Sequence, residues 1–278
     1  MRLAIAVMVA CWLAMAGAAA EPHRIPIIID GRNTQMPANV CRPDAAASVG
    51  LVVISHGRGV NPVERARQQP LACTSATVQW FLARGYVVIS PLRPGYGANN
   101  GPDIEAQTCD ANRDYTVPAT IAARSIAAAI RYAADLPFVR HGRIVVIGQS
   151  AGGLASVAYG RHPDRDVVAI INMAGGNGGH RNGQANNVCF PDLLVRAAGR
   201  LGVGASIPEL WVYAENDSFF APNLARAMHA AFTRAGGKAD LVQPGPFGDD
   251  GHRLFGDRNG VAIWGPIVGR YLATRTGG

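Results

Sequence analysis

Short, continuous runs of apolar residues alternate with longer segments of mixed character through most of the chain. The runs are rich in Val and Ile and lack the strict alternation of a half-exposed strand, which indicates strands covered on both faces. We expect these strands at 51–55, 86–90, 143–148, 167–173, 209–214 and 239–243. Helix-like segments lie between or after them, at about 74–84, 117–134, 151–160, 221–235 and 261–274. This order predicts an α/β fold with a doubly wound, mostly parallel sheet.

The segment before the first of these runs has a different pattern. The stretches HRIPIIID (23–30) and MPANVC (36–41) flank the turn residues DGRN, which predicts a short antiparallel pair of strands. No Pro/Ser-rich linker interrupts the remaining chain, so we expect residues 21–278 to form a single domain.

Two connections stand out by their length, 91–116 and 174–206, and each follows the carboxyl end of a predicted strand. The second is expected to contain a short helix near 190–199. Ligands in open α/β sheets bind at this end of the strands, so both connections are candidate pocket walls. The alternative for either is a mobile surface insertion, above all for the Gly/Asn-rich part at 175–187.

The first 20 residues have the layout of a secretory signal peptide, with one Arg, an apolar run and small residues at the end. Cleavage is expected before Glu21, which predicts a secreted or periplasmic protein without a stable membrane anchor. The alternatives are an uncleaved anchor and lipidation at Cys11. The small-residue end argues against the first, and the poor match of MVAC to a lipoprotein site argues against the second.

The net charge is +7, but the 26 Lys and Arg residues are scattered along the chain and form no basic run. A nucleic-acid-binding protein is expected to concentrate its basic residues in a patch, so we expect no nucleic-acid partner.

Four cysteines follow the expected cleavage site, and an oxidising compartment favours two disulfides among them. Three connectivities are possible, of which we favour Cys41 with Cys73 and Cys109 with Cys189. No C-x-x-C spacing is present, and no His stands at ligand spacing from a Cys, so no metal site is expected.

The stretch IVVIGQSAGGLASVAYG, at 144–160, contains the pattern G-x-S-x-G between an apolar strand and an alanine-rich helix. That context suits a nucleophile elbow, in which the chain turns so sharply that Ser150 is strained and its hydroxyl exposed. Side chains two residues to either side would clash, which explains Gly148 and Gly152. The pattern therefore predicts a serine nucleophile.

A serine hydroxyl needs a base and an acid that orients the base. The acid is expected after the strand at 209–214, where Asp217 stands, and the base in the loop before the last helix, where His252 stands. Glu215, Asp249 and Asp250 are rival acids. The remaining histidines stand on helices, near turns or early in the chain and are less suitable; they are His23, His56, His141, His162, His180 and His229.

Acyl transfer also needs two N–H donors for the oxyanion. The main-chain N–H of Ala151, directly after the serine, is one candidate, and that of Arg58 in the sequence HGRG is the other. His56 precedes the serine in the chain, and we expect it to hold this loop by hydrogen bonds rather than to act as the base.

The combination of HGRG, RPGYG, GQSAGG, END and DDGH resembles the α/β-hydrolase superfamily over almost the whole chain after residue 20. Among its branches the sequence is most similar to secreted, dienelactone-hydrolase-like esterases with little or no lid domain. Dienelactone hydrolase itself uses a cysteine nucleophile, so its lactone specificity does not carry over to a chain with Ser150. The HGGG loop of many lipases and a long apolar lid are also missing, which argues against interfacial lipase activity.

These features predict a serine hydrolase that cleaves small-molecule carboxylic esters without a cofactor. The first alternative is a serine peptidase of the prolyl-oligopeptidase or dipeptidyl-peptidase kind, although that branch usually carries an extra large domain for which 258 residues leave no room. The second is a noncatalytic binding protein of the same fold, although no triad member is lost. Four aromatic residues either line the substrate pocket or pack the core: Tyr96, Phe190, Phe219 and Phe220.

Overall fold

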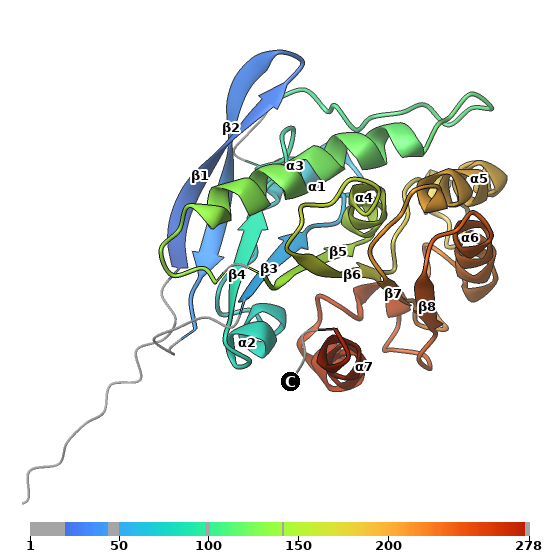
Figure 1. Cartoon of the computed structure of the whole chain (residues 1–278). Helices are drawn as coiled ribbons and strands as arrows, with labels where there is room; N and C mark the ends of the chain where they lie inside the picture. The colour runs from blue at the N-terminus through green and yellow to red at the C-terminus, as the bar shows by residue number, and fades with distance from the viewer. Residues whose placement is uncertain (1–19, 44–49, 98–100, 141, 276–278) are drawn as a thin grey trace, which may run out of the picture.

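A single sheet of eight strands runs through the part of the chain that the computed structural model describes, residues 20–43, 50–97, 101–140 and 142–275 (Figure 1). Its spatial order is β1-β2-β4-β3-β5-β6-β7-β8. From β3 onward neighbouring strands are parallel, whereas β2 pairs antiparallel with both β1 and β4. The strands are β1 (Ala20–Ile29), β2 (Arg32–Cys41), β3 (Gly50–Ser55), β4 (Tyr86–Pro91), β5 (Ile144–Gln149), β6 (Val167–Met173), β7 (Glu209–Val212) and β8 (Ala239–Val242).

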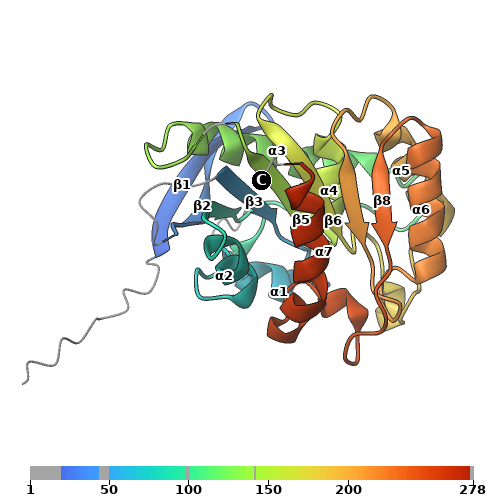
Figure 2. The same cartoon turned by 60° about the horizontal axis from the view of Figure 1, so that its bottom comes forward.

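Helices cover both faces of this sheet. In Figure 1, α3 and α4 lie above the sheet and α2 and α7 below it, and Figure 2 shows α7 crossing in front of the central strands. The helices are α1 (Pro62–Arg67), α2 (Ala76–Leu82), α3 (Thr116–Ala134), α4 (Ala151–Tyr159), α5 (Pro191–Gly202), α6 (Pro222–Arg234) and α7 (Val261–Ala273). The α/β fold with a doubly wound, mostly parallel sheet is therefore confirmed.

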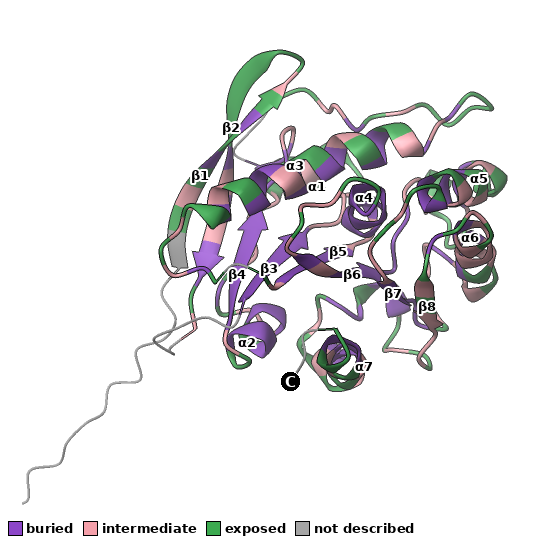
Figure 3. Ribbon diagram, in the orientation of Figure 1, coloured by how far each residue is buried: buried purple, intermediate pink, exposed green. Residues whose placement is uncertain are grey.

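The sheet separates two apolar cores (Figure 3). One joins the sheet to α3, α4, α5 and α6, and the other joins it to α2 and α7. All six residues of β3 and all six of β4 are buried, which is why these strands are continuous Val/Ile runs. Edge strand β8 has no buried residue because no further strand covers its outer side.

Two local features differ from the sequence expectations. The antiparallel pair is not short, since β1 and β2 have ten residues each, and the first four residues of β2 are exposed beyond the core. Helix α1 was not predicted because it buries no residue and so has no apolar periodicity. Its start is nonetheless locally encoded, by Asn61 as N-cap and Pro62 in the first turn.

Two disulfides join segments that are far apart in the sequence. Cys41 at the end of β2 pairs with Cys73 before α2, and Cys109 pairs with Cys189, which links the two long connections to each other. This is the connectivity that we favoured. The predicted signal peptide lies outside the described residues except for Ala20. No helix within the described ranges is long and apolar enough to span a membrane.

Candidate active site

Ser150 stands between β5 and α4 with φ 56° and ψ −122°, a conformation that side chains rarely adopt. Backbone hydrogen bonds hold it there. Its N–H donates to Met173 O at 3.0 Å, and its carbonyl accepts from the N–H of Leu154 at 3.1 Å and of Gly176 at 3.0 Å. Such strain costs about 1–3 kcal/mol and persists only where the surrounding structure imposes it. The sharp turn that the sequence predicts at this position is present.

The glycines on either side make the turn possible. A Cβ on Gly148 would lie 2.0 Å from the carbonyl oxygen of Gly152, and a Cβ on Gly152 would lie 2.1 Å from the carbonyl oxygen of Ser55. The contacted atoms are main chain in both cases, so no rotamer change could relieve the overlap.

The acid and base predicted from the sequence meet beside this turn. Nδ1 of His252 lies 3.1 Å from each carboxylate oxygen of Asp217. Asp217 is 1% exposed and His252 8% exposed. Oδ1 of Asp217 also accepts the N–H groups of Phe219 and Phe220 at 2.8 and 2.9 Å, which orients the carboxylate. Among the described residues no hydrogen bond joins Ser150 Oγ to His252, although both side chains line one pocket.

The rival acids occupy other positions. Glu215 and Asp249 are exposed. Asp250 accepts the N–H groups of Ser218 and His252 at 3.0 and 2.9 Å and the Ser218 hydroxyl at 2.8 Å. Asp250 therefore connects the loop that carries Asp217 to the loop that carries His252. Burial raises the pKa of Asp250, but the donated N–H and O–H groups outweigh burial and lower it below its usual value.

The base loop is also held from the nucleophile side. The side chain of Gln149, the last residue of β5, donates to the carbonyl oxygen of His252 at 2.9 Å. Residue 149 thus ties the strand that carries Ser150 to the loop that carries the base.

The two predicted oxyanion donors are also near Ser150. Ala151 begins α4, Arg58 lies in the loop after β3, and both line a pocket that Ser150 shares. Within the described residues, neither N–H has an intramolecular acceptor. Both N–H groups are therefore available to a ligand oxygen, and their role in stabilising an oxyanion stays a prediction.

The loop after β3 is held by His56 and Gln68. Nε2 of His56 accepts the N–H of Arg93 at 3.0 Å, and Nδ1 lies 2.6 Å from Gly57 O, an arrangement that requires the neutral imidazole with its proton on Nδ1. Burial, and secondarily the charge of Arg93, lowers the pKa of His56. Gln68 donates to Gly57 O and accepts the N–H of Gly59, both at 3.1 Å. The expectation that His56 holds this loop is confirmed.

A buried polar network continues beneath the same loop. The guanidinium of Arg58 pairs with Asp103 and donates to the Tyr96 hydroxyl at 3.1 Å. The Arg93 guanidinium pairs with Glu105 at 2.6 Å, and the Tyr96 hydroxyl donates to Glu105 at 2.6 Å. Tyr96 thus packs behind the pocket and does not line it.

Two pockets meet at Ser150. The arginine pocket, about 330 Å³, is lined by Arg58, Arg113 and Arg181 together with Ala151 and the segment 176–182. The His252 pocket, about 380 Å³, is lined by His252 with Gln149, Thr77, Leu71 and Phe255. Ser150, Arg58, Gly59 and Phe219 line both.

The aromatic candidates are divided by the structure. Phe219 lines both pockets and Phe220 only the arginine pocket, whereas Phe190 is 40% exposed and lines neither. Phe219 is stacked between two imidazoles, with ring centroids 3.8 Å from His180 and 4.1 Å from His252. The face of the predicted base is therefore packed against a ring, which restricts its orientation.

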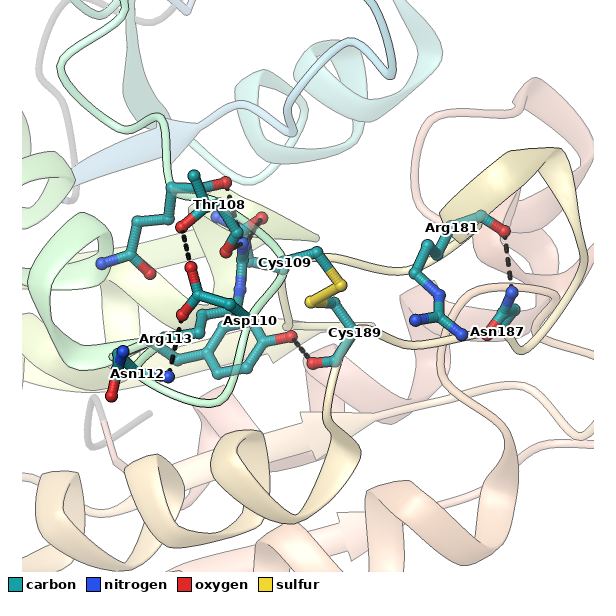
Figure 4. Close-up of a disulfide and its surroundings, with 11 residues drawn as sticks. Thr108, Cys109, Asp110, Asn112, Arg113, Arg181, Asn187 and Cys189 are labelled. Carbon is teal, nitrogen blue, oxygen red and sulfur yellow. Dashed lines mark hydrogen bonds between the residues drawn. A yellow bond between two sulfur atoms is a disulfide. The ribbon is translucent and has the colours of Figure 1, made fainter.

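The disulfide between Cys109 and Cys189 forms part of the arginine pocket (Figure 4). It joins the long connections that follow β4 and β6, and Tyr115 donates a hydrogen bond to the carbonyl oxygen of Cys189. The Gly/Asn-rich segment at 175–187 is thus not only a surface insertion, since residues 176–182 line the pocket.

Sequence reasoning missed several residues of this site. The sequence ranks His180 with the less suitable histidines, on helices, near turns or early in the chain, and it offers Asp250 only as a rival acid. Arg113 stands in an irregular loop and Arg181 in a 3-10 turn of three residues, Arg181–Gly183, and neither segment has a periodicity that predicts side-chain direction. The one available signal was that both long connections follow the carboxyl ends of strands. Within the described ranges, no group of three or more His, Cys, Asp or Glu side chains is arranged to hold a metal ion.

A family model for alpha/beta hydrolases matches residues 51–276, so the chain belongs to the alpha/beta hydrolase family. No curated protein matches its sequence.

Three solved structures illustrate the fold. The acylaminoacyl peptidase of Pyrococcus horikoshii has a TM-score of 0.66 at 12% identity, and the alignment covers 95% of this chain but 42% of the peptidase. The Pyrococcus furiosus esterase Pf2001 has a TM-score of 0.63 at 14% identity, with 93% and 94% of the two chains covered. A Klebsiella pneumoniae protein assigned as a dienelactone hydrolase has a TM-score of 0.58 at 16% identity, with 93% and 98% covered. At these identities the likeness shows the shared fold, and the chain is a hydrolase by family.

Proposed function

We propose that this protein is a secreted serine hydrolase that cleaves small-molecule carboxylic esters. The observation that carries the proposal is the contact of His252 Nδ1 with both oxygens of Asp217, 3.1 Å each, beside a serine held at φ 56°. The free N–H groups of Ala151 and Arg58 support it. Apo sites of this kind often have a loose contact between nucleophile and base that tightens when substrate binds.

The reaction would proceed through an acyl-enzyme. His252 Nε2 accepts the hydroxyl proton of Ser150 as Oγ attacks the ester carbonyl, and the N–H groups of Ala151 and Arg58 donate to the resulting oxyanion. The carbon–oxygen bond of the ester then breaks, and the alcohol leaves with the proton from His252. Water, deprotonated by His252, releases the acid and restores the serine. Nδ1–H of His252 donates to Asp217 throughout, which sets the tautomer of the neutral imidazole and stabilises the imidazolium that forms in between.

Secretion is supported by the N-terminal pattern and by the two disulfides, which persist in oxidising compartments. Cys109–Cys189 lies in the wall of the arginine pocket, so the proposed site itself would depend on that compartment.

The second candidate function is a serine peptidase, because the same catalytic groups cleave amides and one similar fold is that of an acylaminoacyl peptidase. Faster turnover of aminoacyl anilides than of phenyl esters with the same acyl group would favour it.

Labelling with a fluorophosphonate tests the proposed nucleophile, because the reagent reacts with activated serines whatever the natural substrate. We expect stoichiometric modification of Ser150, mapped by mass spectrometry, and its loss in Ser150→Ala and His252→Ala. Ser206→Ala, which removes an exposed serine hydroxyl, is the control and should label as the wild type does. A folded protein that does not label would refute the proposed function.

Substitution of the acid tests the rest of the triad. Asp217→Asn should lower kcat by about three to four orders of magnitude, because the amide stabilises the wrong imidazole tautomer. Asp249→Asn, an exposed carboxylate in the next loop, is the matched control and should leave kcat unchanged. An unaffected rate in Asp217→Asn would exclude it as the acid.

A further inference from the structure

The arrangement of the two pockets separates the two halves of an ester. The leaving alcohol takes its proton from the base, so it has to lie beside His252. The His252 pocket contains that side chain, whereas the arginine pocket contains Ala151 but not His252. The acyl half therefore occupies the arginine pocket. This assignment rests on the proposed function.

The arginine pocket carries positive charge and no negative charge. Of the residues that the structure describes, Arg58, Arg113 and Arg181 are the ionised side chains that line it, and none of the lining residues is Asp or Glu. Asp103 forms a bidentate pair with Arg58 and also lies 3.0 Å from the guanidinium of Arg65. Among the described residues, neither Arg113 nor Arg181 has a carboxylate within 4.0 Å.

Arg113 is a fixed, buried charge in this wall. It is 8% exposed, and its Nη1 donates to the carbonyl oxygens of Gln107 and Thr108 at 3.0 and 2.9 Å. Within the described ranges its Nε has no hydrogen-bond partner. Its Nη2 donates to Asn177 Oδ1 at 3.4 Å, and Asp110, which does not line the pocket, interacts with its charge over a longer distance. A buried guanidinium with no carboxylate in contact is costly, and an anion bound in the pocket would offset that cost.

Arg181 is the group free to bind such an anion. It is exposed, and in the described part of the chain its guanidinium makes no hydrogen bond or ion pair; only its main chain does, with Gln184 and Asn187. Figure 4 shows the disulfide Cys109–Cys189 between Arg181 and Arg113. The two arginines therefore face the pocket from the two connections that this disulfide joins.

The remaining wall suits a polar acyl group. Asn177, Asn182 and His180 contribute polar side chains, and the glycines at 176, 178 and 179 contribute main chain. Close packing excludes larger residues at these positions, since a Cβ on Gly176 would lie 2.5 Å from the ring of Phe220. The apolar side chains of the lining, Val60, Phe219 and Phe220, leave contacts for a short methylene chain beside these polar groups.

We propose that the acyl half of the substrate carries a carboxylate, as in a half-ester of a dicarboxylic acid, and that Arg181 binds this carboxylate in the arginine pocket beside the fixed charge of Arg113. Arg181 is thus the specificity-determining residue for the acyl group. Guanidinium groups bind carboxylates through paired hydrogen bonds, which favours arginine at this position.

Matched substrates test the proposal. The monophenyl esters of glutaric, adipic and pimelic acid are compared with the phenyl esters in which a carboxamide replaces the free carboxylate. We expect the wild type to prefer the best carboxylate substrate over its carboxamide by about tenfold or more in kcat/KM, the size of a charge-assisted hydrogen bond. Arg181→Gln should reduce the preference to about one, and Arg181→Lys should restore part of it. Arg234→Gln, an exposed arginine on α6, has the same change of net charge and should keep the wild-type preference. A ratio near one in wild-type protein that labels with fluorophosphonate would overturn the carboxylate subsite alone.

A binding measurement decides the subsite even without turnover. In the Ser150→Ala protein, adipate should bind by calorimetry more tightly than adipamide, and Arg181→Gln should abolish the difference. Equal binding of adipate and adipamide would overturn the subsite. Failure of fluorophosphonate labelling would instead overturn the proposed function, so the two failures are distinguishable.

Discussion

Glu209, the first residue of β7, is a carboxylic acid in the core. It is 1% exposed, its Oε2 accepts the indole N–H of Trp211 at 2.6 Å, and within the described residues its Oε1 has no partner. No cation pairs with it in that part of the chain. Burial raises the pKa of Glu209 well above its usual value, and the hydrogen bond from Trp211 lowers it only in part.

The raised pKa sets the sign of the pH dependence. The unfolded chain releases this proton near pH 4.3, whereas the folded protein keeps it, so the unfolded state binds fewer protons above that pH. The free energy of unfolding therefore falls as pH rises, by up to about 1.4 kcal/mol per pH unit, until the folded carboxyl itself ionises. This is the reverse of the contribution from a carboxylate with a lowered pKa. Glu209→Gln removes the titration and keeps a carbonyl oxygen for the indole N–H of Trp211. We expect the variant to gain up to about 3 kcal/mol over the wild type between pH 5 and pH 7.

Urea unfolding followed by tryptophan fluorescence, with disulfides intact, measures this at pH 5, 6, 7 and 8. Glu215→Gln, at an exposed position just beyond β7, is the control and should follow the wild-type curve. Glu209→Met also removes the titration but leaves the indole N–H of Trp211 without an acceptor, so it should be less stable than Glu209→Gln by about 1–3 kcal/mol at every pH. If the difference between Glu209→Gln and the wild type does not change with pH, the buried carboxyl is not protonated and the reasoning is wrong.

Two further predictions concern the active-site loops. Gly152→Ala should destabilise the fold by about 1–3 kcal/mol or more, because its Cβ would lie 2.1 Å from a main-chain oxygen. The control, Gly199→Ala on α5, has 3.5 Å to its nearest atom and should be neutral or stabilising by up to about 1 kcal/mol. Thermal unfolding compares the two variants, and equal melting temperatures would contradict the packing argument. Asp250→Ala should lower kcat about tenfold or more, because His252 would be misplaced, whereas Asp249→Ala should leave kcat unchanged. Steady-state kinetics measures both variants, and equal rates would refute the positioning role of Asp250. Because the pKa of Asp250 is lowered, its contribution to the free energy of unfolding should be complete above about pH 4. That contribution should be lost as the pH falls further, through the pKa of Asp250 in the folded protein.

The nucleophile turn was predictable because its determinants are local. Gly148, Ser150 and Gly152 lie within five residues, and a Cβ on Gly148 would overlap the main chain of Gly152 in the same turn. At Gly152 the overlap is with the main chain of Ser55 and His56, so the sequence pattern indicates this glycine but tertiary packing explains it. The strands and most helices were predictable for a similar reason, since two-sided burial leaves continuous Val/Ile runs. Helix α1 was not predicted because none of its residues is buried, so its sequence has no apolar periodicity.

The choice of acid was only partly predictable. Chain order limited it to four carboxylates after β7 and β8, but contact with the imidazole depends on how two loops from different strands meet. The structure brings Asp217 to His252 and uses Asp250 to join their loops. Sequence spacing could not separate these two positions, because both follow a strand end by a few residues.

The sequence by itself determined the layering of the fold, the strained serine and the few candidates for its acid and base. Each of these depends on residues that are close in the chain or on the pattern of buried positions along it. Only the tertiary structure decided the substrate side of the site. Arg113 and Arg181 are 68 residues apart and meet in one pocket because Cys109–Cys189 joins their connections. The direction of a side chain in an irregular loop depends on contacts with distant segments, and no local pattern of residues encodes those contacts.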